Sequence, residues 1–368
     1  MKYVSEYRDP DLSGKLLEKI RERAAGISEK IYIMEVCGTH THAIGNFGIR
    51  QALPENVELI SGPGCPVCVT SIADVDSALY LAQKEEVLFA SFGDMLKVPA
   101  SSGQSLQTLR AKGADVRIVS SPLDCIQLAR ENPEKELVFM GIGFETTAPA
   151  VAATVQAAAK QAVENFSVFS VHKLMPPVIK ELLQDPGLRI DALLCPGHVS
   201  VVTGSSAYEQ VAQSERAAVI SGFEPVDILE SVYMILGQIQ TQKKQVQIQY
   251  KRGVKSAGNL QAQRIMEQVF EPVEANWRGL GNIAQSGLDF KQKYSALNTL
   301  CKFSVPQMSD KEPQGCLCGE ILKGKASPPD CSLYKTKCTP ANPCGPCMVS
   351  SEGACSAYYK YYSIKRTL

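Results

Sequence analysis

Short apolar runs alternate with amphipathic stretches between residue 30 and about residue 222 of this 368-residue chain. Each run is rich in β-branched or aromatic residues and is bounded by Gly, Pro or Ser, which is typical of buried parallel strands. The sequence predicts eight strands, at 31–36, 57–60, 87–91, 116–119, 137–140, 167–171, 192–194 and 217–220. Between these strands, apolar residues recur at helical spacing, as in the stripe of Ile72, Val75, Leu79 and Ala82. This alternation indicates an α/β fold of parallel sheets covered by helices.

The order of these elements predicts how the chain is divided. Two groups of four strands suggest two similar α/β lobes that face a cleft, at residues 1–131 and 132–224. Helical periodicity then predicts bracing helices over 225–299, with two apolar stripes: Leu229, Val232, Tyr233 and Leu236, then Ala262, Ile265, Met266 and Val269. The remaining segment, 300–368, is rich in Cys, Pro and Gly and has little apolar periodicity. We expect something other than a hydrophobic core to hold it together.

Composition and charge exclude several classes of protein. The chain has 38 basic and 38 acidic side chains and a pI near 6.9, which does not fit a polybasic nucleic-acid-binding protein or an acidic disordered tail. The longest apolar run, residues 148–159, is too short to span a bilayer. Residues 1–6 carry charges without an apolar stretch behind them, so no secretory signal is predicted. We expect a cytoplasmic protein with no nucleic-acid or membrane partner.

Cysteines are the most informative residues. There are 13, and seven of them lie between Cys316 and Cys355. In a cytosolic chain, this density favours metal, cluster or redox chemistry over structural disulfides. Four thiolates complete a 4Fe–4S cluster or a structural zinc site, and the spacing favours the cluster. Cys344 and Cys347 form a thioredoxin-type CxxC pair, although they would also fit one knuckle of a zinc ribbon.

Polar residues that could act in catalysis or bind a ligand follow the predicted strands, and all four histidines of the chain are among them. Ligands of open α/β sheets bind outside the carboxyl ends of the strands. One crevice between the lobes could therefore collect Cys37, Cys65, Cys68, Asp94, Glu145, His172 and His198. His40 and His42 alternate as on a strand and would point to opposite sides, and we favour His40 for the crevice.

The cysteines after the first two strands allow more than one interpretation. Cys37 could be an inert buried thiol, a nucleophile beside a histidine base, or a metal ligand. The pair Cys65 and Cys68 precedes a predicted helix, whose N-terminus would stabilise a thiolate for disulfide exchange. The same CxxC spacing also makes half of a zinc site. The residues alone leave these alternatives open.

The other candidates also have structural interpretations. Asp94 and Glu145 could cap helices, and His172 and His198 are as compatible with a structural role as with a functional one. Residues 141–146 lack the third glycine of a dinucleotide fingerprint, and the chain contains no GxxxxGK[ST] sequence. A nicotinamide, flavin or nucleoside triphosphate site is therefore not the first hypothesis.

Five motifs follow one another along the chain: CGTHTH at 37–42, GPGCPVC at 62–68, FGDMLKVP at 92–99, GFETTAP at 143–149 and CPGHVS at 195–200. Near the C-terminus, Cys316, Cys331, Cys338 and Cys355 are separated by 14, 6 and 16 residues. In motif order and in cysteine spacing, the chain resembles the HypD family of NiFe-hydrogenase maturation proteins. This resemblance extends over residues 30 to 356.

The resemblance implies a fold, a cofactor and partners. It implies two α/β domains and a 4Fe–4S cluster bound by Cys316, Cys331, Cys338 and Cys355. With the small iron chaperone HypC, such a protein forms a scaffold on which a transient Fe(CN)2CO group is assembled. HypE delivers each cyanide as a protein thiocyanate, and the finished group passes to the hydrogenase large subunit. The resemblance thus implies a redox-active assembly scaffold rather than a conventional turnover enzyme.

The resemblance also implies roles for single residues. Cys37 would bind the iron, sharing it with a cysteine of HypC, while Cys65 and Cys68 would be a redox pair. The remaining motif positions around the cleft are His40, Asp94, Glu145 and His198. We expect electrons to pass from the cluster through Cys344 and Cys347, or Cys318, to Cys65 and Cys68, and then to the iron site. Two alternatives are a 4Fe–4S disulfide reductase of a protein substrate and a zinc-stabilised interaction scaffold.

Overall fold

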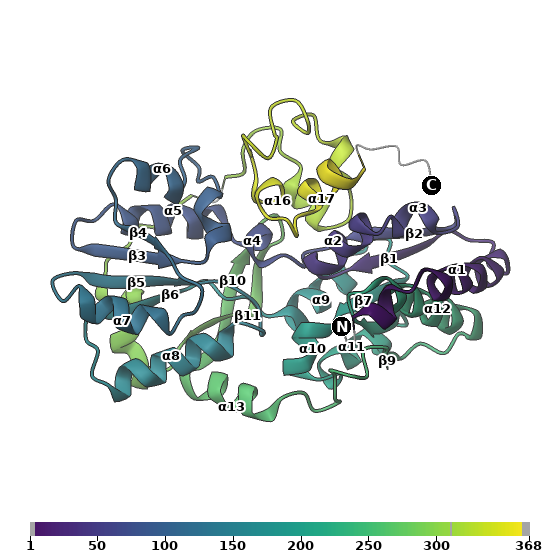
Figure 1. Ribbon diagram of the computed structural model, residues 1–368, viewed down its shortest axis with the longest axis horizontal. Coiled ribbons are helices and arrows are strands. Elements are labelled where there is room, and N and C mark those ends of the chain that lie inside the picture. The colour runs from purple at the N-terminus through teal and green to yellow at the C-terminus, as the bar shows by residue number, and fades with distance from the viewer. Residues whose placement is uncertain (1–3, 310, 363–368) are drawn as a thin grey trace.

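The fold is described by a computed structural model that covers residues 4–309 and 311–362 (Figure 1). The predictions for the N-terminal segment and for the cysteine-rich segment extend to residues 1–3, 310 and 363–368, which lie outside the described residues. Within the described part of the chain, no helix has the length and apolar character needed to cross a bilayer.

All eight predicted strands are present, and each lies within two residues of its predicted ends. They are β1 (Ile31–Glu35), β2 (Val57–Ser61), β3 (Val87–Ser91), β4 (Val116–Ile118), β5 (Glu136–Gly141), β6 (Phe166–Ser170), β7 (Ala192–Pro196) and β8 (Ala217–Ser221). Three strands are additional: β9 (Val246–Ile248), β10 (Phe270–Trp277) and β11 (Gly281–Phe290). The predicted α/β class is therefore confirmed.

Two parallel sheets form the two lobes, but they are not built from consecutive groups of four strands. One sheet has the order β2-β1-β7-β8-β9, and the other has the order β4-β3-β5-β6. Strands β3 to β6 are thus inserted between β2 and β7, with Ile33 of β1 opposite Ala192 of β7. The expected grouping, with its boundary near residue 132, is corrected by this topology. Local periodicity locates strands but carries no information on which strands pair.

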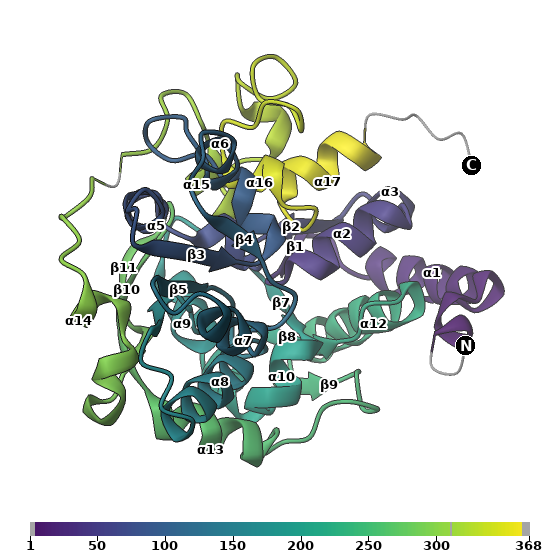
Figure 2. The same ribbon diagram turned by 60° about the vertical axis from the view of Figure 1, so that its left-hand side comes forward.

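Helices cover both sheets (Figures 1 and 2). They are α1 (Pro10–Ala25), α2 (Gly38–Asn46), α3 (Ile49–Ala52), α4 (Pro66–Val69), α5 (Ile72–Ala82), α6 (Leu106–Ala111), α7 (Asp124–Glu131), α8 (Ala148–Lys160), α9 (Met175–Gln184), α10 (Gly197–Thr203), α11 (Glu209–Gln213), α12 (Pro225–Thr241), α13 (Leu260–Val269), α14 (Thr299–Lys302), α15 (Cys318–Leu322), α16 (Pro346–Val349) and α17 (Ala354–Tyr361). Short 3-10 turns are η1 (Ser5–Arg8), η2 (Gly93–Lys97), η3 (Ser206–Tyr208), η4 (Gln292–Leu297) and η5 (Pro328–Asp330).

The predicted apolar stripes lie on helices, although 225–299 is more than a set of bracing helices. Helix α5 buries all four residues of its stripe, and α12 buries Leu229, Val232 and Leu236. Between α13 and η4, however, β10 and β11 form an antiparallel hairpin. Its strands are half-exposed and include charged residues and Pro272, so they lack the continuous apolar pattern of a buried strand.

One hydrophobic cluster joins both lobes to the cysteine-rich segment. It contains Met34 of the first sheet, Phe89 of the second sheet, and Cys318 and Cys347 near the C-terminus. Figure 1 shows this C-terminal segment, in yellow, lying over α2 and α4 at the junction of the lobes. The cysteine-rich segment therefore packs on α2 and α4, the helices that follow β1 and β2 of the first sheet.

Helix α17 is attached to the first lobe by polar contacts. Arg50 donates to the buried carboxylate of Glu35 at 2.7 Å and to the hydroxyl of Tyr362 at 3.0 Å. His42 of α2 contacts the hydroxyl of Tyr361 and the carbonyl oxygen of Ser351, each at 3.1 Å. These contacts hold α17 close to the residues that follow β1.

Candidate functional site

Cys37 lies where β1 ends and is the N-cap residue of α2. Its side chain is 2% exposed, and its Sγ lies 3.8 Å from Nδ1 of His198, which follows β7. Strands β1 and β7 are neighbours in one sheet, so residues beyond their carboxyl ends meet. Burial raises the pKa of the Cys37 thiol to about 12, and the carboxylate of Glu352 acts in the same direction. Without a bound cation, this thiol keeps its proton near neutral pH.

The two histidines beside Cys37 share one aromatic neighbour. The ring centroid of Phe223 lies 4.8 Å from that of His40 and 5.1 Å from that of His198. Burial lowers the pKa of each histidine to about 4, so both rings are neutral near pH 7. His40 Nε2 contacts the carbonyl oxygen of Gly222 at 2.9 Å, while its buried Nδ1 has no hydrogen-bond partner in the described part of the chain. Nδ1 of His40, three residues after Cys37, therefore remains able to form a hydrogen bond.

The CGTHTH segment is helical, which corrects the strand expected there. Cys37 caps the N-terminus of α2, because the chain turns into a helix as soon as it leaves the sheet. His42 still points away from His40, since residues two apart on a helix do not share a face. His42 packs edge-on against the ring of Tyr361 and serves the attachment of α17.

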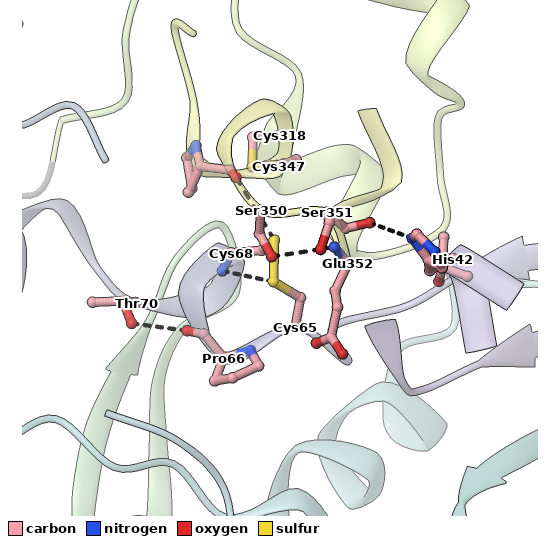
Figure 3. Close-up of a disulfide and its surroundings, with 12 residues drawn as sticks. His42, Cys65, Pro66, Cys68, Thr70, Cys318, Cys347, Ser350, Ser351 and Glu352 are labelled. Atoms are coloured by element: carbon pink, nitrogen blue, oxygen red, sulfur yellow. Dashed lines mark hydrogen bonds between the residues drawn. A yellow bond between two sulfur atoms is a disulfide. The ribbon is translucent and has the colours of Figure 1, made fainter. Parts of the chain in front are cut away.

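Cys65 and Cys68 form a disulfide at the first turn of α4 (Figure 3). The backbone N–H of Cys68 donates to Sγ of Cys65 at 3.2 Å. The residue before this pair, Gly64, touches Cys37, since an added Cβ would lie 2.1 Å from the backbone nitrogen of Cys37. The disulfide and the Cys37 thiol thus belong to two adjacent loops.

Glu352 is a site residue that the sequence reasoning missed. Its carboxylate accepts a hydrogen bond from the hydroxyl of Thr39 at 2.6 Å, and it raises the pKa of Cys37. Figure 3 shows Glu352 below Ser351, on the side of the Cys65–Cys68 disulfide. It comes from the cysteine-rich segment, so only the docking of this segment brings it to the first lobe. No motif or spacing in one sequence could have signalled it.

The four cysteines with the family's spacing line one small pocket of the cysteine-rich segment. The pocket, here called the cysteine pocket, is lined by Cys316, Cys318, Cys331, Cys338, Cys347 and Cys355, with Ile321, Leu333, Tyr334, Gly345 and Met348. Burial raises the pKa of Cys355 above its usual range, and the neighbouring thiols of Cys338, Cys316 and Cys331 add to this effect. In the described part of the chain, no three His, Cys, Asp or Glu side chains converge as they would on a single metal ion.

The donor set of the cysteine pocket, which gathers several thiols around one space, is chemically suited to a 4Fe–4S cluster. Gly345 leaves room beside one thiol, because an added Cβ would lie 3.3 Å from Sγ of Cys316. Backbone N–H donors also face the sulfur atoms, as in the 3.3 Å contact from the nitrogen of Cys344 to Sγ of Cys338. Such donors stabilise the sulfur ligands of iron–sulfur clusters. Cys316, Cys331, Cys338 and Cys355 are the residues that could hold the cluster.

A second disulfide lies between the cysteine pocket and the Cys65–Cys68 disulfide. Cys318 of α15 is bonded to Cys347 of α16, and both residues line the pocket. Pro346, next to Cys347, has its carbonyl oxygen 3.9 Å from Sγ of Cys68. Cys344, which shares a CxxC motif with Cys347, is a free thiol in this structure and lies beside Cys338.

Three predicted site residues lie elsewhere. Asp94 is an exposed residue of the turn η2, and its carboxylate makes no hydrogen bond or ion pair with another described residue. Glu145 is buried, accepts from the backbone N–H of Met175 at 2.9 Å, and has its pKa raised to about 7 by burial. His172 contacts the hydroxyl of Ser170 at 3.1 Å, and burial lowers its pKa to about 3. None of the contacts described for these residues joins them to Cys37.

Known proteins resemble this chain over nearly its whole length. The family model named HypD, described as the hydrogenase formation hypA family, matches residues 11–362. The hydrogenase maturation factor HypD of Escherichia coli K12 is 45% identical over 98% of each chain. Its counterpart in Cupriavidus necator is 40% identical over 99% of this chain and 98% of its own length. A putative hydrogenase expression/formation protein of Methanocaldococcus jannaschii is 42% identical over 97% of this chain and 99% of its own length. The chain therefore belongs to the HypD family of hydrogenase maturation factors.

Proposed function

We propose that this chain, together with HypC, is the cytoplasmic scaffold on which the Fe(CN)2CO group of NiFe-hydrogenase is assembled. One observation carries the proposal beyond family membership. Sulfur sites succeed one another from the cysteine pocket through the Cys318–Cys347 and Cys65–Cys68 disulfides to Cys37. The two disulfides would thus link the proposed iron-binding thiol of Cys37 to the cysteine pocket, the proposed source of electrons.

Cys37 is the proposed ligand of the iron cargo. A soft thiolate suits low-spin iron that carries cyanide and carbon monoxide. Because the pKa of the free thiol is about 12, binding of the metal must displace its proton. In the tautomer with Nδ1 unprotonated, His198, whose Nδ1 lies 3.8 Å from Sγ, can relay that proton, but with a pKa of about 4 it does not retain the proton near neutral pH. The site would then bind iron as a thiolate in surroundings largely closed to water.

His40 is the proposed donor to a bound cyanide. The nitrogen of a metal-bound cyanide carries partial negative charge and needs an N–H or O–H donor. The hydroxyl of Thr39 already donates to Glu352, whereas His40 Nδ1 is buried and has no partner within the described residues. The tautomer with the proton on Nδ1 would leave Nε2 facing a carbonyl oxygen, so reorientation of His40 would accompany cyanide binding.

The Cys65–Cys68 pair is the proposed reductant of the thiocyanate that HypE delivers. In its dithiol form, R–S–CN and the two thiols give R–SH, HCN and the Cys65–Cys68 disulfide. The S–C bond breaks with two electrons from the dithiol, and HCN loses its proton as cyanide binds the iron. Each delivered cyanide therefore leaves one disulfide that must be reduced again.

The Cys318–Cys347 disulfide would couple one-electron transfer from the cluster to the two-electron reduction of the Cys65–Cys68 disulfide. A bound 4Fe–4S cluster would supply electrons one at a time, received from a one-electron protein donor. Cys318 and Cys347 line the cysteine pocket, and Cys347 adjoins the residue that contacts Cys68. This pair can collect two electrons and pass them to Cys65–Cys68 by thiol–disulfide exchange.

Infrared spectroscopy tests the proposal directly. The protein is purified anaerobically after co-expression with its maturation partners, alongside Cys37→Ala. We expect bands of metal-bound cyanide and carbon monoxide in the wild type and none in Cys37→Ala. Bands that survive the substitution would refute Cys37 as the ligand. No bands from a verified complex with an intact cluster would favour a disulfide reductase, and zinc without acid-labile sulfide would favour the zinc scaffold.

A double substitution tests the redox pair separately. Cys65→Ser/Cys68→Ser should leave the absorption spectrum of the cluster unchanged, because neither residue lines the cysteine pocket. We expect the cyanide bands to disappear, together with hydrogenase activity in cells. Normal hydrogenase activity in this variant would end the proposal that Cys65 and Cys68 reduce the thiocyanate.

A further inference from the structure

Arg278 is a fully buried cation that the proposed chemistry leaves unexplained. It lies after β10 and is 0% exposed. Its Nε donates to the two carboxylate oxygens of Glu312 at 3.0 and 3.2 Å. Its other two nitrogens, Nη1 and Nη2, are buried without a hydrogen-bond partner in the described ranges. Because an unsatisfied buried donor costs about 1–3 kcal/mol, these two groups call for an anionic acceptor.

The β10–β11 hairpin places Arg278 next to α4, which carries Cys68, and next to α15, which carries Cys318. The backbone N–H of Arg278 donates at 2.9 Å to the carbonyl oxygen of Val69, the residue that follows Cys68. The next residue, Gly279, touches Gly319 of α15, where an added Cβ would lie 2.2 Å from the α-carbon of Gly319. Gly279 also has a φ of +74°, which favours glycine and permits this close approach. Arg278 is thus fixed at the seam between α4 and the start of the cysteine pocket.

Arg278 lies beside the cysteine pocket. Gly279, the next residue, packs on Gly319, which adjoins the lining residue Cys318, and Glu312, the carboxylate partner of Arg278, precedes the lining residue Cys316 by four positions in the sequence. Arginine suits such a place, because its rigid fork keeps five donors and stays charged at any working pH. Glu312 accepts hydrogen bonds only from Nε, so Nη1 and Nη2 are left without a hydrogen-bond partner among the described residues.

We propose that Arg278 is a positioning residue whose buried positive charge raises the reduction potential of the 4Fe–4S cluster bound by Cys316, Cys331, Cys338 and Cys355. This inference rests on the proposed function, which supplies the cluster. The cluster gains one negative charge when it accepts an electron, so a fixed cation stabilises its reduced form more than its oxidised form. Interior charges act strongly because little water screens them. Net charge and hydrogen bonds to sulfur are known determinants of cluster potentials.

The test is a redox titration of the full-length protein, purified anaerobically and monitored by electron paramagnetic resonance. Arg278→Met removes the charge, and we expect a lower midpoint potential by at least the 59 mV that corresponds to a tenfold change for a one-electron couple. Arg278→Lys retains the charge and should keep most of the wild-type potential. Glu312→Gln removes the opposing anion at a side chain that is 30% exposed, and it should shift the potential upward.

The outcomes separate this inference from the proposed function. Iron and acid-labile sulfide are measured for every variant. A wild-type protein without a 4Fe–4S cluster would overturn both the cofactor and the role of Arg278. Equal potentials in wild type and Arg278→Met, at equal cluster content, would overturn only the role of Arg278. If Arg278→Met does not fold, Glu312→Gln decides: an upward shift supports the inference, and an unchanged potential overturns it.

Discussion

The spacing between the loops of Cys37 and Cys65 can be changed by one methyl group at Gly64. An added Cβ at this position would lie 2.1 Å from the nitrogen and 2.2 Å from the α-carbon of Cys37. Ordinary contact begins at 3.4 Å, so Gly64→Ala must move the two loops apart by about 1.3 Å, the difference between 3.4 and 2.1 Å. Both neighbours are backbone atoms, so no flexible side chain can relieve the overlap.

Gly64→Ala should fold but should assemble iron poorly. Overpacking of this kind costs about 1–3 kcal/mol, which is less than the roughly 5–15 kcal/mol that stabilises a typical native protein. Displacement of a reacting group by about 1 Å lowers rates by roughly 10²-fold. We therefore expect full cluster content, since Gly64 does not line the cysteine pocket, but strongly reduced cyanide and carbon monoxide bands per molecule.

A matched alanine substitution controls for general effects. Gly14 lies in α1 with nothing within 4 Å of an added Cβ, so Gly14→Ala should keep the wild-type bands and stabilise the helix by about 0.5–1 kcal/mol. Infrared intensities are compared at equal protein and iron–sulfur content. Wild-type intensity in Gly64→Ala would refute the reasoning that assembly depends on this spacing.

Three further predictions concern stability and thiol pairing. Arg50→Leu leaves the carboxylate of Glu35 buried without its cation, so urea unfolding should show a loss of about 3–5 kcal/mol, partly restored by Arg50→Leu/Glu35→Leu; equal losses would contradict the pairing. Burial raises the pKa of Glu145 to about 7, so the folded state binds this proton more tightly than the unfolded state, and the contribution of Glu145 to stability should fall by about 3 kcal/mol as pH rises from about 4 to 7. The buried histidines change stability in the opposite direction, so the fall is measured as the difference in unfolding free energy between wild type and Glu145→Gln. Glu145→Gln should lack that fall, and parallel pH curves for the two proteins would refute it. In oxidised, metal-free protein, alkylation and mass spectrometry should count one more free thiol in Cys318→Ser and one fewer in Cys344→Ser, whereas a loss in both would contradict the observed disulfide.

The strands of the two sheets could be predicted because burial on both faces leaves a compositional mark. Residues 87–90 are all apolar, and the structure buries every residue of β3, Val87–Ser91. The β10–β11 hairpin leaves no such mark, because half-exposed positions interrupt its apolar pattern. The order of strands was also beyond a single sequence, since β1 pairs with a strand that follows almost 160 residues later.

The candidate site was predictable to the extent that it depends on strand ends. Cys37 and His198 follow different strands, and the rule that ligands gather at carboxyl ends brought them together without knowledge of strand order. Glu352 and Phe223 escaped prediction because they reach the site through tertiary docking and leave no pattern along the chain. Asp94 carried a motif signal, but its exposed position in this structure gives it no described contact with the site.

The insertion of β3 to β6 between β2 and β7 has a consequence for the order of events during synthesis. At about 5–20 residues per second, a ribosome needs on the order of ten to thirty seconds to make the chain from Ile33 to Ala192. During this interval β1 lacks one neighbour, while the strands of the inserted sheet are contiguous and can fold first. Glu352, on the far side of the Cys37 site, is made later still. The Cys37 site of a nascent chain therefore stays incomplete until translation has nearly ended, and the proposed binding of iron would follow synthesis of the chain.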